Sequence, residues 1–344
     1  MKTVDLVSKI RRVASSSMFN VYRDYWHKAA KYEVLTNFPI HMDIELAGVC
    51  NLKCDFCFQN GLINKPLGLM ELKLFKKIID EGSLKGLYSL KLQIRGESLL
   101  HPNVFDCIAF AKDAGVLDVQ ITTNATLLND EISKKIIESG LDGIVFSVDN
   151  QHSESYETRF DNQTYTDIEG SIKRFLEIRA KVSTSRPRPW VRLQTSIPQF
   201  DAESFRNTKA YIKDKFPEAD IVVVNRLQVY NDDKDTYPDL QINYELLPCS
   251  YLMQRLAIFW NGDVTTCCMD YNNRFNLGKL ESQTIQEIWL SEKMKKFRAL
   301  HKKGDRKTMP ICKHCHSCTN PISEKNEVDK TPRHYDDLKQ LEIA

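Results

Sequence analysis

The chain lacks any apolar run that approaches the roughly eighteen residues needed to span a bilayer, and its first residues lack the continuous apolar core of a signal peptide. It also lacks an excess of charge of either sign, because its 48 basic and 46 acidic residues nearly cancel. The lack of a long apolar run argues against a membrane protein, and the sequence predicts a cytoplasmic one. The balance of basic and acidic residues removes the electrostatic case for nucleic acid as a partner and favours a small-molecule substrate.

Cysteine, in contrast, is abundant and grouped. Ten cysteines would suggest disulfides in a secreted chain, but nine of them fall into two groups with metal-binding spacing. Only Cys107 stands apart, within an apolar helical pattern, and we interpret it as a core residue. A length of 344 residues with 42% apolar content allows a sizeable core and either two domains or one domain with an appendage.

Strand-like and helix-like stretches alternate after about residue 36, which is the pattern of a parallel sheet with crossover helices. Six apolar, β-branched runs predict strands at 41–47, 87–94, 119–122, 143–148, 191–197 and 221–224. Helices are predicted between them at about 70–83, 103–115, 129–139, 165–182 and 202–215. Before residue 36, an apolar spacing predicts a helix packed against the main domain, with Val4, Leu6, Val7, Ile10 and Val13 on one side.

Three cysteines lie close together in the segment CNLKCDFC, at Cys50, Cys54 and Cys57. Thiolates with these spacings can bind one cubane within a single loop, and because a 4Fe-4S cluster prefers four sulfur ligands, one iron is left open. An open iron in a loop after a strand can bind a small chelating molecule. Structural zinc is the alternative, but no histidine or fourth cysteine follows within reach of Cys57 to close such a site.

This segment resembles the CxxxCxφC signature of the radical S-adenosylmethionine (SAM) enzymes, in which an aromatic residue, here Phe56, precedes the last cysteine. The resemblance implies that the open iron binds SAM and that reductive cleavage of SAM yields a 5'-deoxyadenosyl radical, which abstracts hydrogen from the substrate. It also implies a partial (β/α)6 barrel of the TIM-like kind, open on one side, to which the six predicted β/α units correspond. A doubly wound sheet would give the same alternation.

Residues 95–98 follow the second predicted strand, at the end where parallel α/β folds bind ligands. They read RGES and resemble the GGEP motif of the family. The resemblance implies that the backbone at Gly96 and the carboxylate of Glu97 approach the SAM amino group. Arg95 and Ser98 depart from the motif, so the backbone path around Ser98 is left open.

Polar residues also end the third and fourth predicted strands. Residues 122–126 are similar to the TNG-type turn of the family, with helix capping as the alternative. After the fourth strand, the resemblance implies that Ser147 and Arg159 hold the carboxylate and ribose hydroxyls of SAM, with Asp149 beside them as a cofactor-binding residue. A surface salt bridge with Glu157 is the alternative for Arg159.

A second cysteine group begins after residue 246, and its spacing is distinctive. Twelve residues separate Cys249 from Gly262, and a Gly-x4-Cys motif then ends at Cys267. This pattern resembles the SPASM or shorter twitch extension of radical SAM enzymes, which carries auxiliary 4Fe-4S clusters. Asn261 and Gly262 predict a tight hairpin turn within it.

The tail has six cysteines where a full SPASM region has seven, so one auxiliary cluster is expected. Its preferred ligands are Cys249, Cys267, Cys312 and Cys315, and four protein ligands would suit the cluster to electron transfer. Three alternatives stay open, namely Cys268 or Cys318 as a substitute ligand, a second cluster that uses both, and zinc bound with His314 or His316.

The expected organisation has four segments. They are an N-terminal helical extension over 1–36, a radical SAM barrel over 37–245, an auxiliary iron-sulfur domain over 246–320 and a tail over 321–344.

The resemblance implies a radical SAM oxidoreductase that needs a reducing partner such as flavodoxin or ferredoxin. We expect it to dehydrogenate or epimerise a small polyol, aminocyclitol or sugar derivative, with the auxiliary cluster as electron relay. Candidate substrate-facing residues are Asp270 as catalytic base, together with Gln194, Asn225 and Arg226 at strand ends. The alternatives are a peptide-modifying maturase, for which the region before Asn37 looks short, and a non-enzymatic iron-sulfur redox or scaffold protein.

Overall fold

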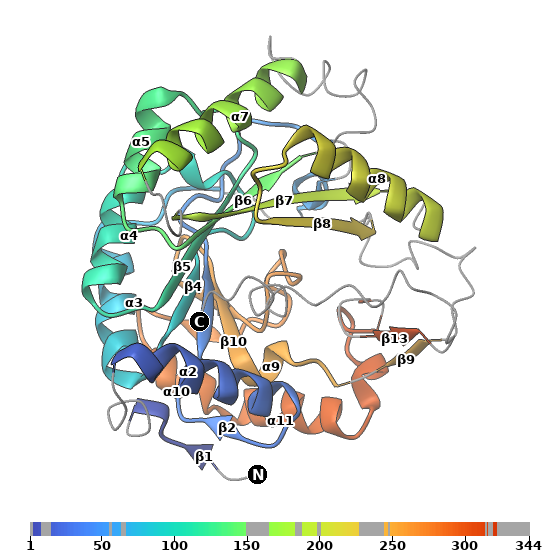
Figure 1. Ribbon diagram of the computed structural model, residues 1–344. Coiled ribbons are helices and arrows are strands. Elements are labelled where there is room, and N and C mark those ends of the chain that lie inside the picture. Colours follow the sequence, from blue (N-terminus) through green and yellow to red (C-terminus); the bar gives the residue numbers. More distant parts are fainter. Residues whose placement is uncertain are drawn as a thin grey trace.

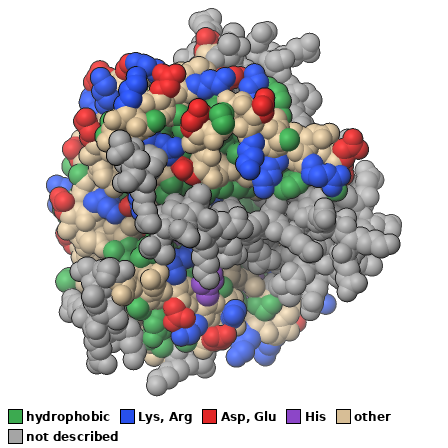
Figure 2. Space-filling view, in the orientation of Figure 1, with side chains coloured by type: hydrophobic (Ala, Val, Ile, Leu, Met, Phe, Trp, Pro, Cys, Tyr) green, Lys and Arg blue, Asp and Glu red, His purple; other side chains and the backbone are tan. Residues whose placement is uncertain are grey.

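The computed structural model describes residues 3–7, 15–54, 57–62, 67–148, 165–182, 188–197, 201–226, 244–246, 248–313, 315 and 319–321. Within these ranges, the main sheet has nine strands in the order β12-β11-β10-β3-β4-β5-β6-β7-β8. Helices α3, α4, α5 and α7 follow one another around its outside, while α2, α10 and α11 lie together at the lower end (Figure 1). Basic and acidic side chains are interspersed over the visible surface rather than gathered by sign (Figure 2).

The strands of the described residues are β1 Thr3–Val4, β2 Leu35–Thr36, β3 His41–Ile44, β4 Ser89–Lys91, β5 Asp118–Thr123, β6 Gly143–Ser147, β7 Trp190–Ile197, β8 Ile221–Arg226, β9 Tyr244–Leu246, β10 Arg255–Ile258, β11 Asp263–Thr265, β12 Gly278–Lys279 and β13 Thr319–Pro321. The α-helices are α2 Ser15–Ala30, α3 Leu72–Lys85, α4 Val104–Asp113, α5 Asp130–Glu138, α7 Tyr165–Val182, α8 Ala202–Lys215, α9 Tyr251–Gln254, α10 Ile285–Trp289 and α11 Glu292–Lys302.

The strands β3 to β8 form the part of the sheet that the sequence predicted. Each pairs in parallel with the next, and the helix that joins two neighbours is α3, α4, α5, α7 or α8. All six predicted strands and all five predicted helices are confirmed, because their apolar periodicities are long and clear. The mixed α/β architecture with a parallel sheet is therefore the predicted fold class.

Side chains on the two faces of β3, β4 and β5 differ sharply. Apolar residues such as Met42, Leu90 and Ile121 are fully buried against the helices. The alternate residues are polar, and Asp43, Lys91 and Gln120 are paired neighbours in one row across β3, β4 and β5. We call this second side, which faces away from the helices, the inner face of the sheet.

The cysteine-rich region after residue 246 extends the same sheet. Its strand β10 pairs in parallel with β3, and β11 returns antiparallel to β10. The predicted hairpin turn at Asn261-Gly262 is confirmed, and Gly262 adopts a φ of +82° that favours glycine. The predicted domain boundaries stay predictions.

The N-terminal region differs in part from the prediction. Val4, expected in a helix, lies in β1 and pairs with Thr36 of β2, while residues 8–14, which include Ile10 and Val13, lie outside the described residues. The helix of this region is α2, and it does pack against the main domain. The Trp26 ring makes an edge contact with His41, and the Trp26 carbonyl accepts a hydrogen bond from Gln254 at 2.9 Å.

None of the helices in the described ranges has the length and apolarity that a membrane crossing requires.

Candidate functional site

The first cysteine cluster lies in the loop that follows β3. Cys50, Cys54 and Cys57 are partly exposed and form no disulfide. The amide of Cys57 donates to the Cys54 carbonyl at 2.9 Å, and the amide of Gln59 donates to the Cys57 sulfur at 3.5 Å. Burial raises the pKa of the Cys50 and Cys57 thiols. A loop whose three cysteines are partly exposed and outside any disulfide fits the proposed metal ligands.

The turn after β5 holds this loop. The side-chain amide of Asn124 lies 3.9 Å from the Cys50 sulfur and donates to the side-chain oxygen of Asn51 at 3.0 Å. The side-chain amide of Asn51 in turn donates to the hydroxyl of Thr126 at 2.8 Å. Ala125 takes a left-handed φ of +64° at the position where a TNG-type turn would carry glycine. The polar residues of the turn thus hold the cysteine loop against the end of β5.

Gly96 lies against the backbone just before the cysteine loop. A Cβ atom added to it would come within 2.2 Å of the Val49 carbonyl and 2.3 Å of the Ala47 carbonyl. Glycine is therefore required here because the protein's own backbone leaves no room for a side chain. The motif had suggested a different reason, namely the approach of SAM.

Glu97 and Ser98 are likewise occupied by contacts within the fold. Glu97 is 2% exposed, and its carboxylate accepts the backbone amides of Leu99 at 3.0 Å and Asn124 at 2.8 Å. Burial raises the pKa of Glu97. The Ser98 hydroxyl donates to the Leu92 carbonyl at 2.7 Å. These residues join the ends of β4 and β5, and a contact of Glu97 with SAM stays a prediction.

The remaining residues expected near SAM are only partly visible. Ser147 is exposed at the end of β6, where it is accessible to a ligand, and its strand neighbour is Gln194 of β7. Phe56, Asp149 and Arg159 lie outside the described residues.

The second cysteine group converges around Cys267. Burial is the main cause that raises the pKa of this thiol well above its ordinary value, and the neighbouring charges of Cys268, Cys312 and Cys315 add to it. The convergence of Cys267, Cys312 and Cys315 agrees with the preferred ligand set. Cys318 and the two histidines of the zinc alternative, His314 and His316, lie outside the described residues.

The backbone of Cys249, the fourth preferred ligand, is held by two hydrogen bonds. Its amide donates to Nδ1 of His301 at 3.1 Å, and its carbonyl accepts the Tyr32 hydroxyl at 2.9 Å. Burial and the nearby Arg306 lower the pKa of His301 to about 4, so its ring is neutral and can accept this bond.

Arg306 performs the same task for the last two ligands. Its guanidinium is 1% exposed and donates to the carbonyls of Cys312 at 3.2 Å and Cys315 at 2.5 Å. Sequence reasoning missed both His301 and Arg306. Their only signal was a histidine and an arginine within a strongly basic helical stretch, which does not distinguish them from surface residues.

Cys268 and Asp270 both make contacts within the fold. Cys268 packs against Ile94, Ala257 and Phe259, and burial together with Asp43 raises its pKa to about 11. It thus lies toward the inner face. Asp270 is 1% exposed, and its carboxylate accepts the amides of residues 274 and 275 and the hydroxyl of residue 265. The Asp270 carboxylate thus stabilises its own turn, and its role as catalytic base stays a prediction.

The described cysteines of both groups form no disulfide and are partly exposed or intermediate in exposure, apart from the buried Cys107, which belongs to neither group. Among the described residues, no three His, Cys, Asp or Glu side chains are close enough to hold one metal ion. The ligands of a cubane each bind a different iron and therefore stand farther apart than the ligands of one zinc ion.

The two cysteine loops touch each other. The ring of Tyr271 lies 5.1 Å from that of Phe58, which follows Cys57, and the side chain of Asn272 donates to the Gly61 carbonyl at 3.3 Å. The turn after Cys267 and Cys268 is therefore packed directly on the turn after Cys57.

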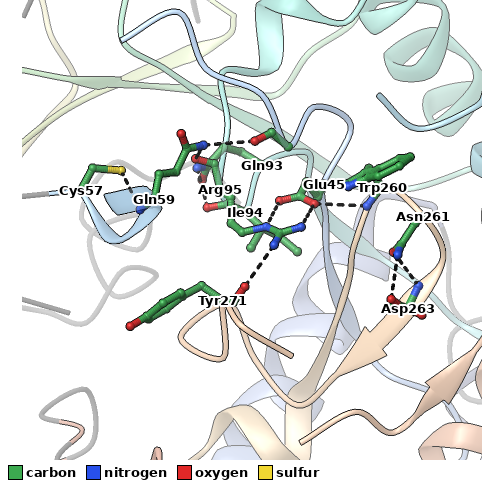
Figure 3. A network of polar contacts seen from close by, with 11 residues as sticks. Glu45, Cys57, Gln59, Gln93, Ile94, Arg95, Trp260, Asn261, Asp263 and Tyr271 are labelled. Atoms are coloured by element: carbon green, nitrogen blue, oxygen red, sulfur yellow. Dashed lines mark hydrogen bonds and ion pairs between the residues drawn. The ribbon is translucent and has the colours of Figure 1, made fainter. Parts of the chain in front are cut away.

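Arg95 fixes this contact (Figure 3). Its guanidinium binds both oxygens of Glu45, at 2.6 and 2.7 Å, and donates to the Tyr271 carbonyl at 3.1 Å. Its own carbonyl accepts the side chain of Gln59 at 3.0 Å. Arg95, one of the two residues that depart from the GGEP motif, thus joins the two loops. An arginine in place of glycine was its signal in the sequence, but its partner could not be read there.

Comparison with known proteins gives two family matches. The description "Radical SAM superfamily" matches residues 44–186, and the SPASM "iron-sulfur cluster-binding domain" matches residues 249–316. The first covers the cysteine loop and strands β4, β5 and β6. The second contains Cys249, Cys267, Cys312 and Cys315.

Two curated proteins illustrate the similarity. The tungsten-containing aldehyde ferredoxin oxidoreductase cofactor-modifying protein of Pyrococcus furiosus is 24% identical over 319 residues, which cover 80% of this chain and 86% of that protein. The AdoMet-dependent heme synthase of Methanosarcina barkeri is 34% identical over 123 residues, or 36% of this chain and 35% of that protein. The second match therefore spans about a third of either chain.

Solved structures share the fold at low identity. BtrN in complex with AdoMet and 2-DOIA has a TM-score of 0.54 and 17% identity, covering 83% of this chain and 94% of that one. The AdoMet-bound anSMEcpe has a TM-score of 0.57 and 16% identity, covering 76% and 84%. Streptococcus suis SuiB bound to S-adenosylmethionine has a TM-score of 0.56 and 16% identity, covering 83% and 73%.

Proposed function

The chain belongs to the radical SAM superfamily and carries an iron-sulfur domain of the SPASM type, and on this basis we propose that it oxidises or epimerises a small polyol or sugar derivative. Its cofactors are SAM, a SAM-binding 4Fe-4S cluster and an auxiliary iron-sulfur cluster. When bound, they supply an electron that cleaves SAM, a radical that abstracts a carbon-bound hydrogen atom, and an acceptor for the electron left on the substrate.

The overall reaction is balanced. A secondary alcohol and SAM give a ketone, methionine, 5'-deoxyadenosine and one proton. The hydrogen atom on carbon goes to the deoxyadenosyl group, the hydroxyl proton goes to a base, and the remaining electron replaces the one used to cleave SAM. A reducing partner of the ferredoxin or flavodoxin kind starts the cycle.

The observation that supports this proposal best is the direct contact of the two cysteine loops. The pairs Tyr271–Phe58 and Arg95–Tyr271 place the auxiliary turn against the turn that follows Cys57. An acceptor near the site of hydrogen abstraction can take an electron from a substrate held between the loops. In this proposal Cys50, Cys54 and Cys57 hold the SAM-binding cluster, while Ser147 is available to bind SAM at the end of β6.

The first test is anaerobic reconstitution followed by iron and sulfide analysis and by an assay for 5'-deoxyadenosine after dithionite reduction with SAM. About eight irons per chain together with SAM cleavage support two four-iron clusters and radical chemistry. About four irons contradict the electron relay. Absence of cleavage in a fully loaded sample favours the iron-sulfur scaffold instead.

Product analysis separates the remaining alternatives. The protein is incubated with candidate polyols and sugar derivatives in deuterated water. Epimerisation would place deuterium on the carbon whose configuration is inverted, whereas dehydrogenation would convert that carbon to a carbonyl. Modification of a precursor peptide in place of both would support the peptide maturase.

A second candidate comes from the long match to the Pyrococcus furiosus protein, whose name describes modification of a cofactor. A similarity that covers 80% of this chain supports an organic cofactor as an alternative substrate. Release of a modified cofactor from a partner enzyme, detected by mass spectrometry, would favour it over a free polyol.

A further inference from the structure

Ionised groups are concentrated on the inner face of the sheet, below the two cysteine loops. The carboxylates of Asp43 and Glu45 come from β3 and the residue just after it, and the cations Lys91 and Arg95 come from β4 and the segment after it. Arg255 comes from β10. These five groups lie on one face of the sheet, on or just after strands β3, β4 and β10.

Each of the two carboxylates already has a cationic partner. Glu45 is 0% exposed and holds Arg95 through both oxygens. Asp43 faces Arg255 at 3.4 Å. Burial alone would raise the pKa of Asp43, but Arg255 and His41 lower it below its usual range, so the carboxylate is ionised. The two acidic groups and two of the cations therefore cancel.

His41 adds no charge to this balance. It lies beside Asp43 at 3.3 Å and beside the Ser89 hydroxyl at 2.8 Å. Burial, with the neighbouring Arg255, lowers its pKa to about 4. The ring is therefore neutral at physiological pH.

Of these five groups, Lys91 has no ion-pair partner among the described residues, and Asp118, a further carboxylate on this face, already accepts from Ser89 and Gln120. Lys91 is partly exposed, and among the described residues its ammonium has neither an ion pair nor a hydrogen bond. Its row neighbours are Asp43, which is already paired with Arg255, and Gln120, which is neutral and donates to Asp118. An ammonium group that is accessible on a protein's inner wall and lacks a partner can gain a strong, charge-assisted contact from an anionic ligand.

We propose that Lys91 binds an anionic group of the substrate, a carboxylate or a phosphate, at the inner face. The proposal rests on the proposed function and narrows its substrate class to acidic or phosphorylated sugar derivatives and polyols. Cys268 lies on the same side, because it packs against Ala257, the β10 residue that is paired with Asp43. The anionic end of the substrate is thus placed beside the auxiliary turn.

The test measures binding of radiolabelled inorganic phosphate to the reconstituted protein with SAM, by anaerobic equilibrium dialysis. We expect saturable binding of one phosphate per chain that weakens at least tenfold in Lys91→Met and is retained in Lys91→Arg. Lys73→Met is the matched control, because Lys73 is exposed on the outer helix α3 and should leave phosphate binding unchanged. A melting curve checks that each variant is folded.

Competition distinguishes the two sources of the anion. Displacement by glucose 6-phosphate indicates a phosphate site, displacement by gluconate a carboxylate site, and sorbitol should displace neither. Equal phosphate binding by the wild type and Lys91→Met, absence of saturable binding, or equal displacement by sorbitol overturns the proposal. Failure of the proposed function is a separate result, because it is seen as absence of SAM cleavage in the wild type whatever phosphate does.

Discussion

The ring of Tyr271 lies 5.1 Å from the ring of Phe58, so the turn that follows one cysteine centre is packed on the turn that follows the other. Arg95, which is paired with the buried Glu45, stabilises this contact through its hydrogen bond to the Tyr271 carbonyl. The relative position of the two centres is therefore set by side chains outside both ligand sets. Variants of these side chains can be compared with variants of the ligands themselves.

Replacing Arg95 by Met should strongly destabilise the protein. It leaves the fully buried Glu45 carboxylate without its cation, which typically costs about 3–5 kcal/mol. Urea unfolding of the reconstituted protein measures the change. The matched control is Arg174→Met, which removes a solvent-exposed two-bond pair with Asp130 and should leave the free energy of unfolding unchanged within error.

A double variant checks the cause of this loss. Adding Glu45→Gln to Arg95→Met removes the unpaired charge and should recover part of the stability. Losses that are simply additive would show that the buried pair is not responsible.

Replacing Gly96 by Ala should disrupt the first cysteine loop. The added methyl group would overlap the Val49 and Ala47 carbonyls, and overpacking of this kind costs about 1–3 kcal/mol. We expect less iron per chain after reconstitution and a lower melting temperature. Gly170→Ala is the control, since nothing lies within 4 Å of its added atom in helix α7, and alanine there should raise stability by about 0.5–1 kcal/mol. Full iron loading of the Gly96 variant would contradict the close approach.

Cys267 and Cys268 are adjacent but should behave differently. Cys267→Ala should reduce the iron content from about eight to about four per chain while SAM cleavage continues, because only the auxiliary centre is lost. Cys268→Ala should retain about eight irons, since its thiol packs against Ala257 and Phe259 on the inner side. Loss of four irons in the second variant would make Cys268 a ligand.

His41 should make the protein less stable as the pH falls. Its pKa is about 4 in the folded chain but about 6.5 when unfolded, so between these values the unfolded state binds more protons and stability falls with pH. Asp118, whose pKa burial and Asp142 raise to about 6, acts in the opposite direction. The comparison with His41→Gln isolates the histidine. Between pH 7 and pH 5, the wild type should lose about 2 kcal/mol relative to the variant in urea unfolding.

A difference in the free energy of unfolding between the two proteins that stays constant from pH 7 to pH 5 would contradict a neutral, buried His41. Both proteins should be measured with the clusters in the same loading state, which iron analysis at each pH verifies.

The sheet could be predicted from the sequence because its determinants are local. Each of β3 to β8 has an apolar, β-branched run, and each crossover helix has a periodic apolar face, so short windows of sequence are sufficient. Val4 was assigned wrongly for the same reason. Its apolar spacing is helical, but its pairing with Thr36 is made by a segment more than thirty positions away.

The site was predictable only where ligands are marked by spacing. Cysteine spacing indicated both centres, whereas the residues that hold them in place are distant in sequence. Arg95 contacts Tyr271 across 176 positions, and His301 contacts Cys249 across 52. Gly96 was found through its motif but for another reason, since its close neighbour is the protein backbone. Asp270 was chosen by position along the chain, and only its burial shows that its carboxylate is used within its own turn.

The pairing of β10 with β3 bears on how such proteins can be cut and recombined. A fragment that ends before residue 246 would expose the backbone of β3 along its whole length, and a bare strand edge of this kind promotes aggregation. A chimera that exchanges the cysteine-rich tail must therefore exchange β10 together with a matching β3. The tail contributes a strand to the main sheet and therefore cannot be exchanged as an independent unit.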